Sequence, residues 1–308
     1  TRLSEYIKNN KDKLDTKQLV RFVLDDDADS DFRGCITKDT PEKQRRLNDI
    51  QIEYLDKMKN EGLISYGVSD YLFFGSASRN AEMAGIKGAA IGSALTLFVC
   101  FIIAFPIGVA TAVYLEEFAP KNKFTELIEI NINNLAAVPS VVFGILGLAI
   151  FIKLFGMPRS IPLVGGLVLA LMTLPTIIIS SRAAIKAVPP SIRDGALGIG
   201  ASKMQTTMHH VVPLAIPGML TGTIIGMAQA LGETAPLLMI GMVAFIVDIP
   251  GGITDPGTVL PVQIFMWADF AERMFVQKTS AAIIVLLIFL MLMNGGAVWL
   301  RRKLERRW

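Results

Sequence analysis

Residues 88–115 contain no charged side chain, and the run is 28 residues long. A helix needs about 20 predominantly apolar residues to cross the hydrocarbon core of a bilayer. The run therefore predicts a transmembrane helix, and Pro106 and Gly108 inside it are expected to bend that helix. A chain with such a run is expected to fold across a membrane.

Other apolar runs follow and are separated by short polar segments. From Pro213 to Val247 the single charge is Glu233. Because these 35 residues are too many for one straight span, and Gly232 and Pro236 lie near their centre, we expect one span and a shorter broken piece. The expected spans are residues 88–115, 134–152, 161–181, 213–232 with the broken piece 235–247, and 279–300.

The composition agrees with a membrane protein and argues against other classes. Of the 308 residues, 52% are hydrophobic and 19% are charged, and the mean hydropathy is +0.49, outside the range of ordinary soluble domains. The net charge of +3 comes from loops and not from a basic patch with interleaved aromatic residues, so no nucleic-acid partner is expected. Cys35 lies in a polar segment and Cys100 in an apolar run, so we expect no disulfide between them.

The sequence carries no sign of an enzyme. It lacks the G-x-x-x-x-G-K-[ST] motif that cradles ATP phosphates, and no nucleophile–base pair is visible. Its two histidines, His209 and His210, lie in a polar segment between two spans, where we expect no metal site. We therefore expect no catalytic residues, no metal and no cofactor bound by this chain.

The first 85 residues differ from the rest because they are polar and carry nearly balanced charge. Residues 41–61 predict an amphipathic helix, with Pro41 at its first helical position and Gly62 after its end. We expect residues 1–85 to form a small, mainly helical soluble domain and residues 86–308 to form the transmembrane domain.

A polar segment at residues 193–212 lies between two apolar runs. We expect two short helices across one face of the membrane, with Gly200 permitting a tight turn between them. The spacing of an acidic residue, two small residues, a glycine and a later proline resembles the coupling loop of ABC-importer permeases. The residues in this pattern are Asp194, Gly195, Ala196, Gly200 and Pro213. The resemblance implies that the segment docks a separate ATPase.

Basic residues predict the orientation of the chain, because cytoplasmic loops carry an excess of Lys and Arg. Residues 301–307, after the last span, include five Lys and Arg residues, so the C-terminus is expected in the cytoplasm. Counting back places residues 193–212 in the cytoplasm and residues 1–85 outside. Since residues 1–85 carry no export signal, we expect one more transmembrane helix before Thr1, which makes six.

Three further segments read L-A-A-V-P-S-V-V-F-G-I-L-G-L-A (135–149), T-L-P-T-I-I-I-S-S-R-A-A-I-K-A-V-P-P-S-I-R (173–193) and L-G-E-T-A-P-L-L (231–238). They resemble signatures of the phosphate-specific (Pst) importer permeases, with the PstA branch most similar. The resemblance implies a type I ABC-importer permease core in the bacterial inner membrane. It also implies a paralogous PstC-type permease, a cytoplasmic PstB-type ATPase dimer that uses ATP, and an extracytoplasmic PstS-type phosphate-binding protein as partners.

Five residues are candidates for the translocation pathway. Glu233 is the single acid in its apolar stretch, and a charge is costly in a membrane, so we expect it to face the pore or a partner. A carboxylate repels phosphate, so its expected role is to hold a basic residue. Many Pst permeases carry Arg where this chain has Gln229, so we expect the positive charge from the paired permease or from helix N-termini. Hydroxyls beside the proline positions complete the set: Ser140, Thr176 and Thr234.

Two other functions stay open at this point. A permease for another oxyanion, such as sulfate or molybdate, would carry a similar coupling loop, although residues 135–149 and 231–238 favour phosphate. A phosphate-sensing membrane protein that senses through residues 1–85 would share the same transmembrane segments.

Overall fold

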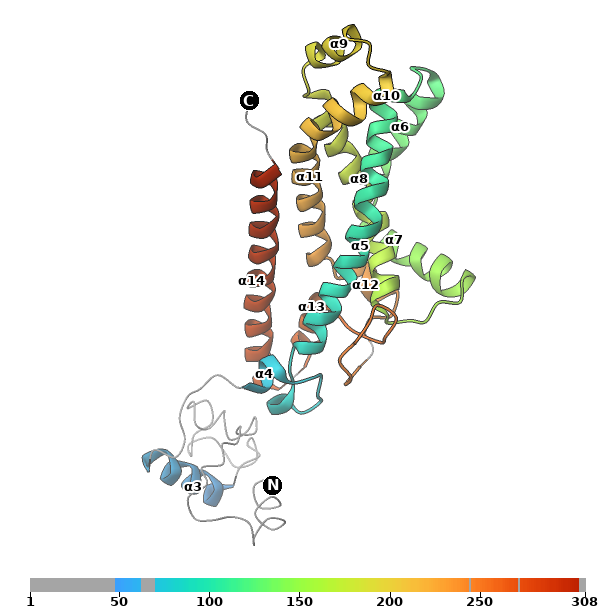
Figure 1. The fold of residues 1–308 in the computed structure, drawn as a ribbon. Helices are drawn as coiled ribbons and strands as arrows, with labels where there is room; N and C mark the ends of the chain where they lie inside the picture. The colour runs from blue at the N-terminus through green and yellow to red at the C-terminus, as the bar shows by residue number, and fades with distance from the viewer. Residues whose placement is uncertain (1–47, 62–69, 244, 271, 305–308) are drawn as a thin grey trace.

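The computed structural model describes residues 48–61, 70–243, 245–270 and 272–304, and every regular element in these ranges is a helix (Figure 1). The expected all-α fold is confirmed. Within these ranges, four helices are long and apolar enough to cross a membrane, and a bent pair of helices brings the number of spans to as many as five. The four are Lys87–Phe118, Pro162–Lys186, Lys203–Gly232 and Arg273–Lys303.

Short helices precede the first span. They are α3 (Asp49–Asn60), α4 (Asp70–Phe74) and the 3₁₀ turn η2 (Ala81–Met83). The backbone N–H of Asn48 donates to the side-chain oxygen of Gln51 at 2.9 Å, which caps the start of α3. The first part of the helix expected at 41–61 lies outside the described residues.

The first span is α5 (Lys87–Val113), which continues directly into a π-helical turn, η3 (Tyr114–Phe118). It covers the expected span 88–115. Pro106 lies inside α5 and does not end it, in agreement with the tolerance of membrane helices for proline.

The span expected at 134–152 is not a single helix, because the chain bends there by 101°. α6 (Lys123–Ala136) runs up to the bend, and α7 (Ser140–Gly147) with the π-helical segment η4 (Leu148–Leu154) follows it. The expected span therefore contains only the last residues of α6, followed by the bend, α7 and most of η4.

Pro139 explains the position of this bend. Proline has no N–H to continue a helix, and it disfavours the helical conformation in the residue before it. Its carbonyl instead accepts a hydrogen bond from the Val142 N–H at 3.0 Å, which starts α7. α6 was missed in the sequence because Glu126 and Glu129 lower the hydropathy of its segment.

The middle of the chain forms a second set of helices. These are α8 (Pro162–Lys186), α9 (Pro190–Gly198), α10 (Lys203–Thr206), the π-helical turn η5 (Thr207–Val211), α11 (Val212–Gly232) and α12 (Ala235–Met239). α8 covers the expected span 161–181, and α11 covers 213–232. The broken piece expected at 235–247 is helical only over α12.

The last two helices are α13 (Leu260–Ala268) and α14 (Arg273–Leu304). α14 covers the expected span 279–300, whereas α13 lies between expected spans, where no helix was expected. The Leu260 N–H donates to Oγ of Ser93 in α5 at 2.8 Å, and Leu260 is fully buried, which holds α13 against the start of α5.

Two ends of the bundle are distinguishable in Figure 1. α9, α10 and the end of α14 lie at one end, called here the α9 end. α13, α4 and the starts of α5 and α14 lie at the other, called here the α13 end. α14 stands beside α11 at the edge of the bundle, and most of its apolar length is exposed.

A second core lies at the α13 end. It joins Leu72 and Ala84, from before the first span, to Trp267 of α13 and Phe275 of α14. The ammonium group of Lys278 in α14 also donates to the carbonyl oxygen of Ala84. The segment before α5 therefore packs on the membrane helices, while the expected division of the chain at residue 85 stays a prediction.

The main core forms where α5, α8 and α11 pack together. A Cβ added at Gly166 of α8 would lie 2.5 Å from Cβ of Val99 in α5, and one at Gly222 of α11 would lie 1.8 Å from Oγ of Ser180 in α8. Membrane helices gain little from the hydrophobic effect against lipid, so close packing of small residues drives their association. These glycines therefore set how closely the helices approach.

We expect Gly166→Ala to destabilise the α5–α8 contact, because its new methyl group would overlap Val99. Overpacking of this kind costs roughly 1–3 kcal/mol. Gly226→Ala is the matched control, since its Cβ would meet no atom closer than 3.7 Å. Thermal unfolding of the purified protein in detergent should show a lower midpoint for Gly166→Ala than for Gly226→Ala. Equal midpoints would contradict the role given to Gly166.

Candidate functional site

The polar connection between α8 and α11 forms a defined helix–turn–helix at the α9 end (Figure 1). α9 is a short separate helix, as expected. The second short helix expected within 193–212 is different, because α10 runs without a break through η5 into α11 and forms one helix of 30 residues. Pro213 is the second residue of α11, and the π-helical turn η5 ends just before α11, so the helix passes through Pro213 although proline has no N–H to donate.

The turn between α9 and α10 is set by Gly200. The Ala201 N–H donates to the carbonyl of Ala196 and the Gly200 N–H to that of Leu197, both at 3.0 Å, which is a Schellman motif. Gly200 has φ of +91°, a conformation that strains residues with a side chain. Ser202 then caps α10 by exchanging hydrogen bonds with Gln205.

The five predicted coupling residues take different positions around this turn. Asp194 and Gly195 are exposed on α9, and Gly200 is exposed at the turn. Ala196 is 6% exposed and lies on the inner face of α9, which contacts η5. The structure therefore brings four of the five into α9 and its turn and places Pro213 farther along the continuous helix. Their role in docking stays a prediction.

Sequence reasoning missed an apolar surface on the same turn. Ile199 is 85% exposed, Met204 56% and Leu197 49%. Exposed apolar side chains that gather beside polar ones mark contact sites for proteins or membranes. The signal was present in the sequence as apolar residues placed directly around Gly200.

Sequence reasoning also missed a network of ion pairs beneath this turn. Arg182 of α8 contacts Glu116 of η3 at 2.5 Å and Glu129 of α6 at 2.8 Å. Lys186 of α8 lies 3.4 Å from Glu116. The network fixes the ends of the α5–η3 helix and of α8 relative to the middle of α6. Its partners lie far apart along the chain, so their spacing gave no local signal.

Arg193 forms a second group of contacts, between α9 and the rest of the bundle. Its guanidinium lies 2.8 Å from the carboxylate of Glu117 in η3. It also donates to the carbonyl oxygens of Val188 and Ile185, at 2.7 and 3.0 Å. Cations near the last carbonyls of a helix are favourable because those carbonyls lack helical partners. Arg193 thus closes the end of α8 and attaches α9 to α5.

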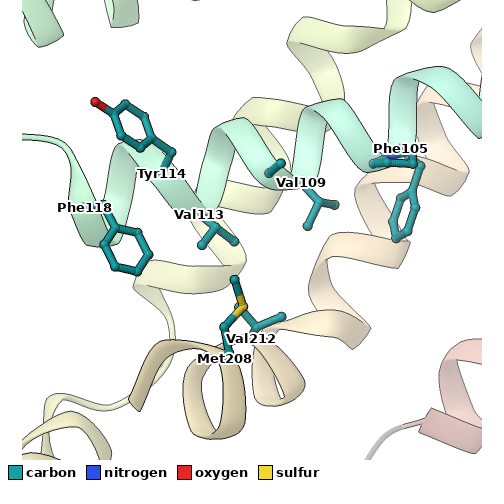
Figure 2. A pocket seen from close by; sticks show the side chains of 9 residues that line it. Phe105, Val109, Val113, Tyr114, Phe118, Met208 and Val212 are labelled. Atoms are coloured by element: carbon teal, nitrogen blue, oxygen red, sulfur yellow. The ribbon is translucent and has the colours of Figure 1, made fainter. Parts of the chain in front are cut away.

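An apolar pocket of about 400 Å³ opens beside this network. Figure 2 shows side chains of α5 and η3, among them Val109, Val113 and Phe118, facing Met208 and Val212 from η5 and α11. The amino group of Lys203 lies 5.6 Å from the ring centre of Phe118, within the range of a cation–π contact.

The second candidate region is the break between α11 and α12. Glu233 has an extended backbone and separates the two helices. α12 packs against α7, and a Cβ added at Gly144 of α7 would lie 2.7 Å from Cα of Pro236. The break at 137–139 and the break at Glu233 therefore belong to two short helices that touch each other.

The predicted pathway residues lie around these breaks. Glu233, Thr234, Ser140 and Thr176 are partly exposed, and Gln229 is exposed. Thr176 lies near Gly226 of α11, Ser140 is the first residue of α7, and Thr234 lies just before α12. Across the described ranges, no Lys or Arg side chain pairs with Glu233 within 4.0 Å. The part of these five residues in a translocation pathway stays a prediction. The source of the positive charge that would attract phosphate is also still a prediction.

Among the residues that the structure describes, no three His, Cys, Asp or Glu side chains group together so that they could hold a metal ion.

Comparisons with known proteins agree with this architecture. The family model described as "binding-protein-dependent transport system inner membrane component" matches residues 104–308. The probable ABC transporter permease protein YqgI of Bacillus subtilis is 34% identical over 184 residues, which cover 58% of this chain and 62% of that protein. The phosphate transport system permease protein PstC of Haemophilus influenzae is 30% identical, over 65% of this chain and 69% of that protein.

A PstA relative is similar to the chain as well. The phosphate transport system permease protein PstA of Yersinia pestis is 27% identical, over 73% of this chain and 75% of that protein. The resemblance to Pst permeases drawn from the three sequence segments is thus confirmed, with both PstA and PstC among the relatives. The match spans only 62% of the length of the two B. subtilis permeases YqgI and YqgH.

Solved structures share the fold at low sequence identity. The MetNI methionine ABC transporter, in an inward-facing crystal form, aligns with a TM-score of 0.60 at 17% identity, over 72% of this chain and 96% of that chain. A bacterial ABC transporter involved in the import of alginate aligns with a TM-score of 0.55 at 13% identity. The type I permease fold is therefore confirmed. The family model covers most of this chain, and the chain belongs to the family of inner membrane components of binding-protein-dependent transport systems.

Proposed function

We propose that this chain is a permease subunit of an ATP-driven importer of inorganic phosphate, of the PstA type. As a member of its family it is a multi-pass inner membrane transport subunit and not an enzyme. The observation that carries the proposal is the contact between α7 and α12, because two of the three Pst-like segments, 135–149 and 231–238, meet there. Relatives named as phosphate transport permeases support the same substrate.

The distribution of charge supports an orientation with the α9 end in the cytoplasm. Arg182, Lys186, Arg193 and Lys203 lie at this end, together with the basic residues at the end of α14. Cytoplasmic segments near membrane spans carry such an excess. The C-terminus is then cytoplasmic, and residues 1–85 lie outside.

The turn between α9 and α10, called here the docking turn, has an exposed apolar surface formed by Leu197, Ile199 and Met204. This surface supports contact with an ATPase. Exposed apolar side chains that gather in a patch mark contact sites, and a partner protein that covers them removes them from water. The ATPase is a PstB-type dimer that binds and hydrolyses the ATP, and this chain binds no cofactor. The other partners are a PstC-type permease, which completes the pathway, and an extracytoplasmic PstS-type binding protein, which delivers phosphate.

The breaks beside α7 and α12 provide irregular backbone that can line a translocation route. Broken helices free backbone groups to line a water-filled route, and such irregular backbone is tolerated only where protein or water covers it. Glu233 at one break holds an Arg of the paired permease near the route. Gln229, one turn earlier, offers hydrogen bonds without charge, and Ser140, Thr176 and Thr234 offer hydroxyls.

The substrate is tested with the complete transporter in proteoliposomes, with ATP on the cytoplasmic side. We expect ATP-dependent uptake of labelled phosphate that excess unlabelled phosphate suppresses and excess sulfate or molybdate does not. Uptake of sulfate or molybdate in place of phosphate would show that the chain serves another oxyanion.

The turn is tested by Gly200→Ala. A side chain at φ of +91° costs about 1–2 kcal/mol, so we expect roughly tenfold weaker binding of the ATPase and a matching loss of uptake. Gly198→Ala is the control, because Gly198 is equally open to solvent but lies within α9 at an ordinary φ. Binding of the purified ATPase to each variant is measured by titration. Equal affinities for both variants would count against the turn as the docking element.

Glu233→Gln tests the pathway, because it keeps the shape of the side chain and removes its charge. We expect phosphate uptake to fall about tenfold or more, which corresponds to about 1.4 kcal/mol, while the complex still assembles. Asp248→Asn, an exposed carboxylate in the segment after α12, is the control and should leave uptake unchanged. Full uptake by Glu233→Gln would mean that this carboxylate is merely hydrated at the membrane surface.

A further inference from the structure

The side chain of Arg193 joins three helices at the α9 end. Its Nε and Nη2 donate to Oε1 of Glu117 at 3.1 and 2.8 Å. Its Nη1 and Nη2 donate to the carbonyl oxygens of Val188 and Ile185. Arg193 belongs to α9, Glu117 to the end of the α5–η3 helix, and the two carbonyls to the end of α8. One guanidinium therefore attaches α9 to two membrane helices.

This contact is shielded and directional. Glu117 is 11% exposed and Arg193 is 23% exposed, so water competes less for their hydrogen bonds than it does at an open surface. A guanidinium donates from a rigid planar fork, whereas an ammonium group is a point charge on a flexible stem. Four donated hydrogen bonds from one such fork fix the angle between α9 and α5 as well as the distance.

An apolar pocket of about 400 Å³ lies beside the contact, between the end of α5 and η5 (Figure 2). Next to the pocket, Val113 of α5 and Val211 of η5 pack in one buried hydrophobic cluster. Apolar contacts of this kind have no direction. The Glu117–Arg193 pair, in contrast, is a directed polar link between α9 and the α5–η3 helix.

We propose that Glu117 and Arg193 are positioning residues for transport, which pass the displacement of α9 to α5 and so set the amount of substrate moved for each ATP hydrolysed. The proposal rests on the proposed function of the chain as an ATP-driven permease. Because Arg193 also holds the end of α8, α5 and α8 follow α9 together, and their contact at Gly166 keeps them one unit. Packed helices of this kind shift as rigid elements between discrete arrangements.

The test uses the complete transporter in proteoliposomes and measures phosphate transported per ATP hydrolysed. Glu117→Gln keeps the shape of the side chain and removes its charge. We expect this ratio to fall at least tenfold while ATPase binding and ATP hydrolysis stay within about twofold. Glu117→Asp, which keeps the charge on a shorter side chain, should retain more of the ratio and serves as the test variant if Glu117→Gln does not assemble.

Lys186→Gln is the matched control. It also removes an ion pair at the α9 end, but Glu116 keeps its contact with Arg182, and Lys186 is 62% exposed. We expect its ratio to match that of the unaltered protein. An unchanged ratio in Glu117→Gln, or an equal loss in Lys186→Gln, would overturn the proposal.

A second measurement does not depend on the substrate. Spin labels at Tyr114→Cys and Met208→Cys lie on opposite sides of the pocket, in a background where Cys35 and Cys100 are replaced by Ala (Figure 2). Binding of a non-hydrolysable ATP analogue should change the distance between the labels, and Glu117→Gln should abolish the change. If the unaltered transporter moves no phosphate but shows this behaviour, the proposed substrate is wrong and this proposal stands. A change that persists in Glu117→Gln overturns it.

Discussion

The close approach of α5 to α8 is the constraint on which the rest of the bundle depends. In a bilayer, apolar side chains gain nothing by leaving lipid for protein, so helices associate where their surfaces approach without gaps. Gly166 provides that approach against Val99, and Gly108 of α5 provides it again against Ile177 of α8. α11 then packs on α8 through Gly222, and the ion pair of Arg182 with Glu116 joins α8 to the end of the α5–η3 helix. A larger residue at one of these glycines would therefore push apart the two helices that meet there.

Much of the fold could be predicted from apolar runs alone, because a bilayer demands a minimum length of uncharged helix. The long helices α5, α8, α11 and α14 follow from such runs, whereas short, amphipathic or broken helices do not. α6 is mostly exposed and carries Glu126 and Glu129, so its hydropathy is low, although Glu129 pairs with Arg182 of α8. α13 is short and packs against α5 and α14. Such tertiary contacts stabilise a helix without leaving a local sequence pattern that predicts it.

The candidate site, too, could be predicted from the sequence only in part. Gly200 and the turn around it could be predicted, because a glycine at the end of a helix has a local conformational reason. The continuity of α10 with α11 was missed, since Pro213 suggested a start and the π-helical turn before it removed the need for one. The pairs Arg182–Glu116 and Arg193–Glu117 join residues more than 60 positions apart. Only the folded chain brings such partners together.

The helix from Lys203 to Gly232 is continuous but not straight. α10 and η5 run at an angle to α11 (Figure 1), and the π-helical turn and Pro213 lie between them. Helices bend at such features because the regular backbone hydrogen bonds are interrupted there. The first residue of the helix follows Ser202 at the turn, and its last residue precedes Glu233. A change in the angle of this bend would therefore move the turn at Gly200 relative to the break at Glu233, although no loop separates them.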